Sequence, residues 1–287
     1  EIASCLVGSE MCIRDRLKEC RKVLQKIEPE NTVNDLIGQM EVEIEKDRNS
    51  AVGWRYLMQP WLRTPLMIAV CIMFFQQFVG INTVIYYSPK IFLMAGFEST
   101  LSAIWASVGI GIVNVVFTVI SLYLVDRIGR RKLYFIGLSG IAFSVLCLSA
   151  CFIYANQLGE IGRWLMVIFM FGYVAFFAIS IGPLGWLVIS EIFPQKVRGL
   201  GTSIGSLAVW IFNCIVSFTF FKIIDFFSIP GTEIVVGQTT SENPAGAFFL
   251  YGFIAVLGLV WGYLFLPETK GLSLEEIEQK WRKNREC

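Results

Sequence analysis

Six long apolar segments dominate this 287-residue chain and limit what it can fold into. They cover roughly residues 64–95, 101–125, 133–154, 164–190, 203–222 and 245–266. A helix needs about 20 apolar residues to cross the hydrocarbon core of a bilayer, and each segment reaches or approaches that length. Only 16% of the residues are charged, against about a quarter in a soluble domain. The sequence therefore predicts an all-α membrane protein with six transmembrane helices.

Polar segments flank the six apolar ones. Residues 17–63 carry charges of both signs in amphipathic patterns, which predicts a linker of short cytoplasmic helices. Residues 267–287 form a polar tail that we also expect in the cytoplasm. Residues 1–16 fit poorly with the rest of the chain and resemble a translated sequencing-library adapter. We therefore interpret residues 1–16 as non-native and the chain as a fragment.

The distribution of basic residues predicts the orientation in the membrane. The chain contains 24 Lys and Arg residues. All of them except Lys90, Arg163 and Lys222 lie before the first span, in the loop after the second span, in the loop after the fourth span, or in the tail. Positive residues favour the cytoplasmic side. We therefore expect a multi-pass protein of the plasma membrane, with both termini of this chain in the cytoplasm.

The composition excludes several classes of chemistry. The chain contains no His, which removes His-dependent catalysis and His-liganded metal sites. The eight cysteines include no CxxC pair, and no Asp or Glu falls inside any of the six spans. An intramembrane enzyme would need such an acid or base at depth. We therefore expect no enzymatic activity, no metal and no cofactor.

The first apolar span carries three carboxamides near its middle. Gln76, Gln77 and Asn82 lie around Gly80 in the run QQFVGIN. Amides facing lipid would lack hydrogen-bond partners, so we expect them to face a wet cavity where Gly80 loosens the helix. Uncharged donors and acceptors suit a neutral polyhydroxy solute. The alternative is that the amides bind neighbouring helices as structural contacts.

The fourth span is interrupted in the corresponding place. Its run SIGPLGW contains Gly182, Pro183 and Gly185, and Pro removes a backbone donor and kinks a helix. Interruptions at matching places in two three-helix sets are typical of the binding site of transporters built from inverted repeats. We therefore predict that the two helices bend at Gly80 and at Gly182–Pro183.

Charged residues gather in the loops on the predicted cytoplasmic side, in the runs DRIGRRK, SEIFPQKVRG and PETKG. They could serve only as positive-inside anchors. The alternative is an ionic latch that joins helix ends in one conformation and separates in the other. Exposed ion pairs contribute about 0–1 kcal/mol each, which is adequate for two states that differ by a few kcal/mol. The candidate latch residues are Asp126, Arg127, Arg130, Arg131, Glu191, Arg198 and Glu268.

Together, in this order, QQFVGIN followed by YY, DRIGRR, EIFP with RG, and PETKG resemble the sugar porters of the major facilitator superfamily. The resemblance runs from about Leu17 to Trp281. It implies the cytoplasmic helices and the second six transmembrane helices of a twelve-helix transporter. The N-terminal six-helix half is missing from this chain.

The resemblance also implies which residues bind the sugar. The matching positions are Gln76, Gln77, Asn82, Asn114, Trp186, Trp210 and Asn213. An indole can pack on a sugar ring while its N–H binds a hydroxyl, although core packing remains the alternative for either Trp. Tyr86 and Tyr87 match tyrosines that close over the sugar from outside.

Two positions depart from the family pattern. Ala178 stands where facilitative glucose transporters carry a Glu, and Val209 stands where some members have an amide. The run AISIGPLGW is more similar to proton symporters, whose proton-carrying carboxylate lies in the missing half. The predicted function is therefore alternating-access transport of a monosaccharide (hexose, pentose or inositol) with a proton. A facilitative uniporter and a transport-dead sugar sensor on the same fold remain alternatives.

Overall fold

The computed structural model describes residues 33, 37–38, 57–97, 99–228, 234–236, 239–268 and 270, without the side chains of 195–196, 234–236 and 239–241. The chain divides into two compact units, Glu1–Tyr56 and Leu57–Cys287, and all elements named below belong to the second. The segment 1–16, most of the linker 17–63 and most of the tail 267–287 lie outside the described residues.

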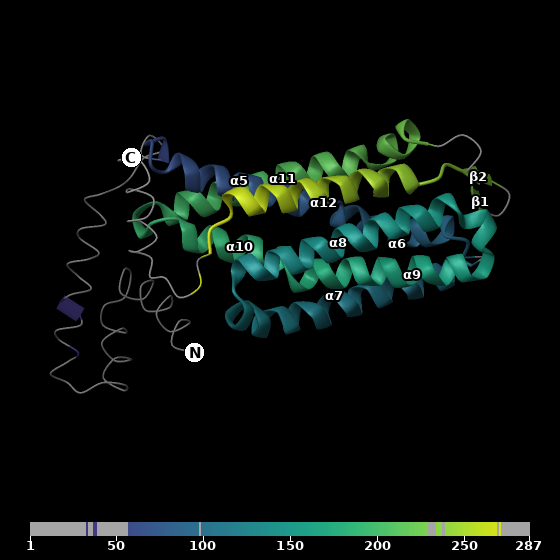
Figure 1. The fold of residues 1–287 in the computed structure, drawn as a ribbon, viewed down its shortest axis with the longest axis horizontal. Coiled ribbons are helices and arrows are strands. Elements are labelled where there is room, and N and C mark those ends of the chain that lie inside the picture. Colours follow the sequence, from purple (N-terminus) through teal and green to yellow (C-terminus); the bar gives the residue numbers. More distant parts are fainter. Residues whose placement is uncertain are drawn as a thin grey trace. The chain divides into compact units, whose positions relative to one another are not determined.

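Six helical spans of the described part are long and apolar enough to cross a membrane, and Figure 1 shows their axes running side by side. Two of the spans consist of two helices each. The helices are α5 (Arg63–Phe78) with α6 (Ile81–Met94), α7 (Thr100–Ile128), α8 (Arg130–Ile153), α9 (Ala155–Ile179) with α10 (Ile181–Ile192), α11 (Gln195–Phe226) and α12 (Ala245–Phe265). The predicted six-helix, all-α membrane architecture is confirmed.

The fourth and fifth spans begin earlier than the sequence predicts. The α9 helix starts at Ala155 and passes through a kink at Gly159, whose φ is 52°. The α11 helix starts directly after Pro194. Apolar length detects only the part of a helix that suits hydrocarbon, whereas the hydrogen-bonded helix continues into polar sequence on either side.

A short antiparallel hairpin between α11 and α12 is an addition that the sequence did not indicate. Strands β1 (Ile234–Val236) and β2 (Thr239–Ser241) pair with Ile234 opposite Ser241. The hairpin marks one end of the bundle, which we call the hairpin end (Figure 1). The opposite end carries the α7–α8 corner at Gly129, and we call it the basic end.

The interior depends on close helix contacts. The α8 helix packs against both α9 and α12, while α5 packs against α11 and α7 against α9. Buried Tyr134 of α8 lies over Gly262 of α12, and its hydroxyl donates to the Gly258 carbonyl at 2.9 Å. Small residues and hydrogen bonds between helices are the expected stabilising contacts where lipid is as apolar as the side chains.

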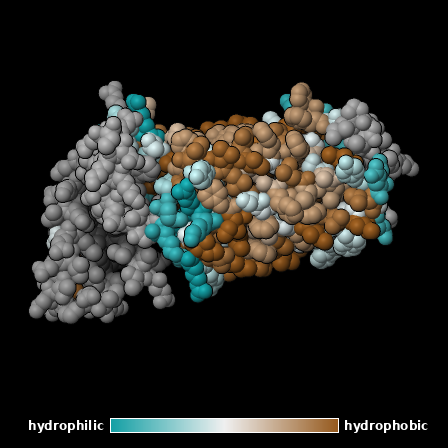
Figure 2. Space-filling view, in the orientation of Figure 1, coloured by the Kyte–Doolittle hydropathy of each residue, from teal (hydrophilic) through white to brown (hydrophobic). Residues whose placement is uncertain are grey.

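The outer surface matches a bilayer. Figure 2 shows a hydrophobic belt around the face in view, bounded by hydrophilic residues towards both ends. The exposed side chains of α7 include Leu101, Trp105, Ile112, Val115 and Leu122. Such a surface would be unfavourable in water and is suited to hydrocarbon.

Both predicted helix interruptions exist, but the second lies earlier than expected. Gly80 separates α5 from α6 in the left-handed region, at φ 86° and ψ 16°. Ser180, at φ −125° and ψ −102°, separates α9 from α10. Gly182 and Pro183 therefore lie in the first turn of α10, where Pro is tolerated because first-turn N–H groups have no intrahelical partner.

The break at Gly80 predicts a strong dependence on that glycine. A Cβ there would be held in a left-handed conformation that costs about 1–2 kcal/mol, and it would also overlap the Tyr251 ring. We expect Gly80→Ala to lower the thermal unfolding temperature clearly in detergent. Gly111→Ala on α7 is the control, since a Cβ there meets no atom within 4 Å. Equal unfolding temperatures for the two variants would contradict the description of the break.

Candidate functional site

A cavity of about 270 Å³ lies in the bundle at the level of the two helix breaks. Small-molecule pockets are typically about 300–1,000 Å³, so this one suits a small ligand. None of the 12 lining residues carries an ionisable side chain. They are Gln76, Gln77, Ile81, Asn82, Asn114, Thr118, Phe177, Ala178, Gly182, Pro183, Trp186 and Val209.

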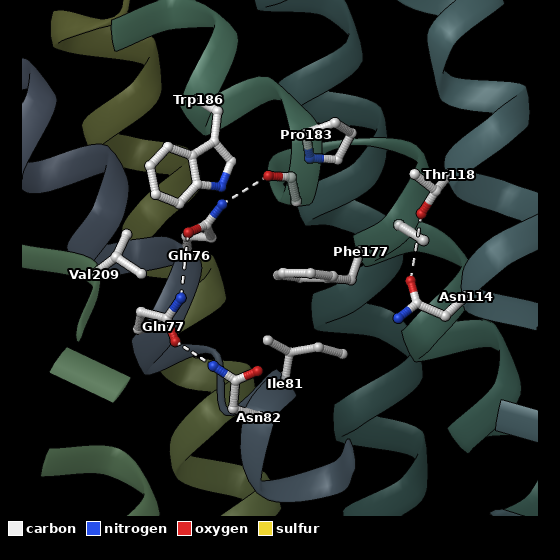
Figure 3. A pocket seen from close by; sticks show the side chains of 12 residues that line it. Gln76, Gln77, Ile81, Asn82, Asn114, Thr118, Phe177, Pro183, Trp186 and Val209 are labelled. Atoms are coloured by element: carbon white, nitrogen blue, oxygen red, sulfur yellow. Dashed lines mark hydrogen bonds between the residues drawn. The ribbon is translucent and has the colours of Figure 1, made fainter. Parts of the chain in front are cut away.

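One wall of the cavity is a chain of amides that crosses the first break (Figure 3). Asn82 Nδ2 of α6 donates to Gln77 Oε1 of α5 at 2.6 Å. Gln77 Nε2 donates to Gln76 Oε1 at 3.2 Å. Gln76 Nε2 in turn donates to the backbone carbonyls of Ile181 at 3.0 Å and Gly182 at 2.7 Å. The chain therefore joins the first interrupted span to the second.

The direction of this chain follows from its fixed end. Carbonyl oxygens can only accept, so Gln76 must present its NH₂ group to α10 and its oxygen to Gln77. Gln77 must then donate to Gln76 and accept from Asn82. Asn82 Oδ1 is left without a partner among the described residues, at the cavity. The amide wall thus offers an acceptor to a ligand hydroxyl.

The opposite wall is built by α7 and the second break. Thr118 Oγ1 donates to Asn114 Oδ1 at 3.4 Å, which leaves the Asn114 NH₂ group as a possible donor to a ligand. Figure 3 shows the Phe177 ring between the two polar walls and the half-exposed Trp186 indole beside Gln76. Aromatic faces next to amides suit a ring with one apolar and one hydroxylated side. The arrangement can bind a neutral solute and contains no acid or base.

Four further predicted residues lie outside this cavity. Trp210 is on α11 with its side chain 66% exposed. Asn213 is buried and donates to the hydroxyl of Tyr86 at 3.3 Å, while Tyr87 donates to the Ser217 carbonyl at 3.3 Å. These bonds connect α6 to α11 on the hairpin side of the break. The structure thus brings the predicted amides, Asn114 and Trp186 together and separates the α11 pair and both tyrosines from them.

Several lining residues were not predicted as site residues. Thr118 lies four residues after Asn114, so helical spacing on one face could have indicated it. Ile81 and Phe177 resemble any other apolar residue of a span, and no sequence signal distinguishes them. Ala178 and Val209 were noted only as departures from the family pattern, yet both line the cavity.

The predicted latch residues gather at the basic end. Arg130 Nη2 lies 2.7 Å from Glu191 Oε1 and 3.5 Å from Asp126 Oδ1. Arg130 and Glu191 are largely buried, whereas Asp126 is exposed. The short contact links the start of α8 to the end of α10. Arg198 Nε and Nη2 are buried and have no hydrogen-bond partner among the described residues.

The Glu268 carboxylate accepts hydrogen bonds from backbone N–H groups at this end. Its two carboxylate oxygens accept from the N–H groups of Arg130 at 3.1 Å and Arg131 at 3.2 Å, at the N-terminus of α8. A carboxylate there satisfies unpaired N–H groups and favours the positive end of the helix dipole. Lys270 Nζ donates to the Arg127 carbonyl at 2.7 Å, at the C-terminal end of α7. Glu268 and Lys270, at the start of the tail, thereby bind the α7–α8 corner.

Comparison with known proteins identifies the class to which this fold and cavity belong. Residues 11–281 match the family described as "Sugar (and other) transporter". The glucose transporter GlcP of Staphylococcus epidermidis is 35% identical over 94% of this chain and 56% of its own length. The D-xylose-proton symporter of Escherichia coli is 33% identical over 93% and 51%, respectively. A solved structure of the proton:xylose symporter XylE bound to 6-bromo-6-deoxy-D-glucose has a TM-score of 0.70 and 31% identity, covering 95% and 54%.

The chain belongs to the sugar transporter family of the major facilitator superfamily. It is an integral, multi-pass membrane protein, and these relatives are transporters rather than enzymes. The chain spans about half the length of these relatives. Among the described residues, no group of three or more Cys, Asp or Glu side chains could hold a metal ion.

Proposed function

We propose that this chain is the C-terminal six-helix half of a monosaccharide transporter that works by alternating access. The observation that carries the proposal is an uncharged, amide-lined cavity at the level of two helix breaks. Sugar binds there, at mid-membrane, and a second six-helix bundle supplies the facing wall. The bends at Gly80 and near Gly182–Pro183 let the site open to one side and then to the other.

The lining supports a neutral sugar as the substrate. A charged solute would leave its ion unpaired, because no lining residue is ionisable. Asn82 Oδ1 accepts from one hydroxyl, the Asn114 NH₂ group donates to another, and Trp186 packs on the ring. Trp210 and Asn213 lie outside the cavity, and in this proposal they reach the sugar only when the second bundle is present. Tyr86 and Tyr87 move with α6 as the outer gate.

Proton symport is the proposed mode of coupling. The run AISIGPLGW supports it, and the D-xylose-proton symporter of Escherichia coli is 33% identical to this chain. The glucose facilitated diffusion protein of Zymomonas mobilis is also 33% identical, so overall similarity favours neither mode. Since the cavity contains no ionisable group, the proton would be carried by a residue of the missing half. Sequencing the transcript upstream of Leu17 decides between them: an Asp in a first added span favours symport, and its absence favours a uniporter.

The basic end supports the proposed latch and orientation. Arg130 forms ion pairs with Glu191 and Asp126, and two buried nitrogens of Arg198 have no hydrogen-bond partner among the described residues. We place this end in the cytoplasm, at the plasma membrane, because the basic residues gather there. Asp126, Arg127, Arg130, Arg131, Glu191, Arg198 and Glu268 would stabilise the outward-facing state.

Neutralising the latch should shift the population inward. We place a single cysteine in the cavity, Thr118→Cys, in a variant whose native cysteines have been replaced by serine. Its labelling by an impermeant maleimide added outside the vesicles measures access to the cavity from that side. We expect Glu191→Gln with Arg198→Gln to slow this labelling severalfold, because the outward-facing state loses its ion pairs. Glu160→Gln, an exposed carboxylate on α9, is the control. Unchanged labelling in the double variant would contradict the latch.

Sugar binding tests the proposal directly. The purified chain in lipid nanodiscs should bind radiolabelled D-glucose, D-xylose or inositol, and D-glucuronate should not compete. Gln77→Ala breaks the amide chain and removes partners from Gln76 and Asn82, so we expect affinity to fall about tenfold or more. Gln157→Ala, an exposed amide on α9, should bind as the unmodified chain does.

The same assay tests the direction of the amide chain. A deoxyfluoro sugar can accept a weak hydrogen bond but cannot donate one. At the hydroxyl that contacts Asn82, deoxy and deoxyfluoro glucose should therefore lose affinity equally. If fluorine restores affinity at every sensitive position, the wall donates and the polarity is wrong. Absence of binding by any neutral sugar would contradict the proposed site in this chain.

A further inference from the structure

Each helix break leaves a backbone carbonyl without its usual donor. In a continuous helix, the carbonyl of residue i accepts from the N–H of residue i+4. In lipid, no water can replace a missing donor, so the protein must supply one. The described structure supplies a side-chain hydroxyl from another helix at both breaks.

At the first break, one carbonyl without its helical donor is that of buried Val79. Its helical donor would be the N–H of Thr83, but that N–H turns to the Gly80 carbonyl at 3.1 Å because Gly80 is left-handed. The hydroxyl of Tyr173, which lies on α9, donates to the Val79 carbonyl at 2.7 Å. Tyr173 is fully buried and does not line the cavity.

At the second break, one carbonyl without its helical donor is that of Ile179. Its helical donor would come from residue 183, which is Pro and has no N–H. The hydroxyl of buried Ser121 on α7 donates to it at 2.7 Å. Gln76 adds its bonds to the carbonyls of Ile181 and Gly182 just beyond. The first interrupted span thus contacts the break of the second, and α9 contacts the break of the first.

Tyr173 hydrogen-bonds the backbone at the break that the amide wall crosses. Gln77 lies before the break and Asn82 after it, and their 2.6 Å hydrogen bond spans the break. The geometry of that bond depends on how α6 is set relative to α5. The Tyr173 hydroxyl fixes this relation without lining the cavity, since it binds the carbonyl of Val79, which lies between the two amides in the sequence.

We infer that Tyr173 is a positioning residue of the sugar site. It acts through the Val79 carbonyl to keep the side chains of Gln77 and Asn82 within hydrogen-bonding distance of each other. This inference rests on the proposed function for its effect on sugar. It does not assign Tyr173 a contact with the ligand. Removing its hydroxyl loosens the α5–α6 break and disorders the amide wall.

Tyr173→Phe tests the inference, with Tyr134→Phe as the matched control. Tyr134 is equally buried and also donates to a helix carbonyl, but that carbonyl belongs to Gly258 of α12 and to neither break. Both variants should unfold at a lower temperature than the unmodified chain. In nanodiscs, sugar affinity should fall about tenfold in Tyr173→Phe and stay unchanged in Tyr134→Phe. If the unmodified chain binds sugar, equal affinity in the two variants would overturn the inference.

Hydrogen–deuterium exchange separates this inference from the proposed function. Peptides covering residues 76–84 should exchange several times faster in Tyr173→Phe and at the unmodified rate in Tyr134→Phe. If the unmodified chain binds no sugar, the proposed function fails, and faster exchange at the break still supports the positioning role. If exchange at residues 76–84 is unchanged in Tyr173→Phe, the positioning role is refuted whether or not sugar binds.

Discussion

The architecture depends on supplying hydrogen-bond donors to backbone carbonyls inside two of the apolar spans. Two of the six spans are interrupted, and an interruption in hydrocarbon is tolerated only where other groups replace the lost helical bonds. The hydroxyls of Tyr173 and Ser121 and the amide of Gln76 donate to carbonyls at the two breaks. Because the donors come from α9, α7 and α5, the breaks cannot be considered separately from the packing of the bundle.

The candidate site arises from the same contacts. Gln76 binds two carbonyls of α10 and thereby sets the direction of the other amides in the chain, which ends at Asn82. One residue therefore both stabilises the second break and orients the cavity wall. A ligand that competes for Gln76 would also alter the contact between the two interrupted spans. In the proposed function, this contact would link sugar binding to the helix movements of alternating access.

The basic end has a different physical character. Its contacts are charged, and the carboxylate of Glu268 binds backbone N–H groups at the start of α8. The Arg130–Glu191 pair joins α8 to α10. Partly buried contacts hold these helix ends together, whereas two buried nitrogens of Arg198 have no hydrogen-bond partner among the described residues.

Sequence alone determined the class of the fold, because apolar length and the placement of charge depend on the solvent rather than on tertiary contacts. It also located both interruptions to within a few residues, since glycine at positive φ and proline act locally. It found the amides because polar groups are rare in such spans.

Only the tertiary structure decided which residues share the cavity. Val209 lines it while its neighbour Trp210 is exposed, and the rotation of α11 against α5 that separates them leaves no local signal. The role of Tyr173 was equally hidden, because its partner is a backbone carbonyl, and carbonyls are identical along the chain. Periodicity and composition show which groups need a partner, but only the packing of distant helices determines which partner each group receives.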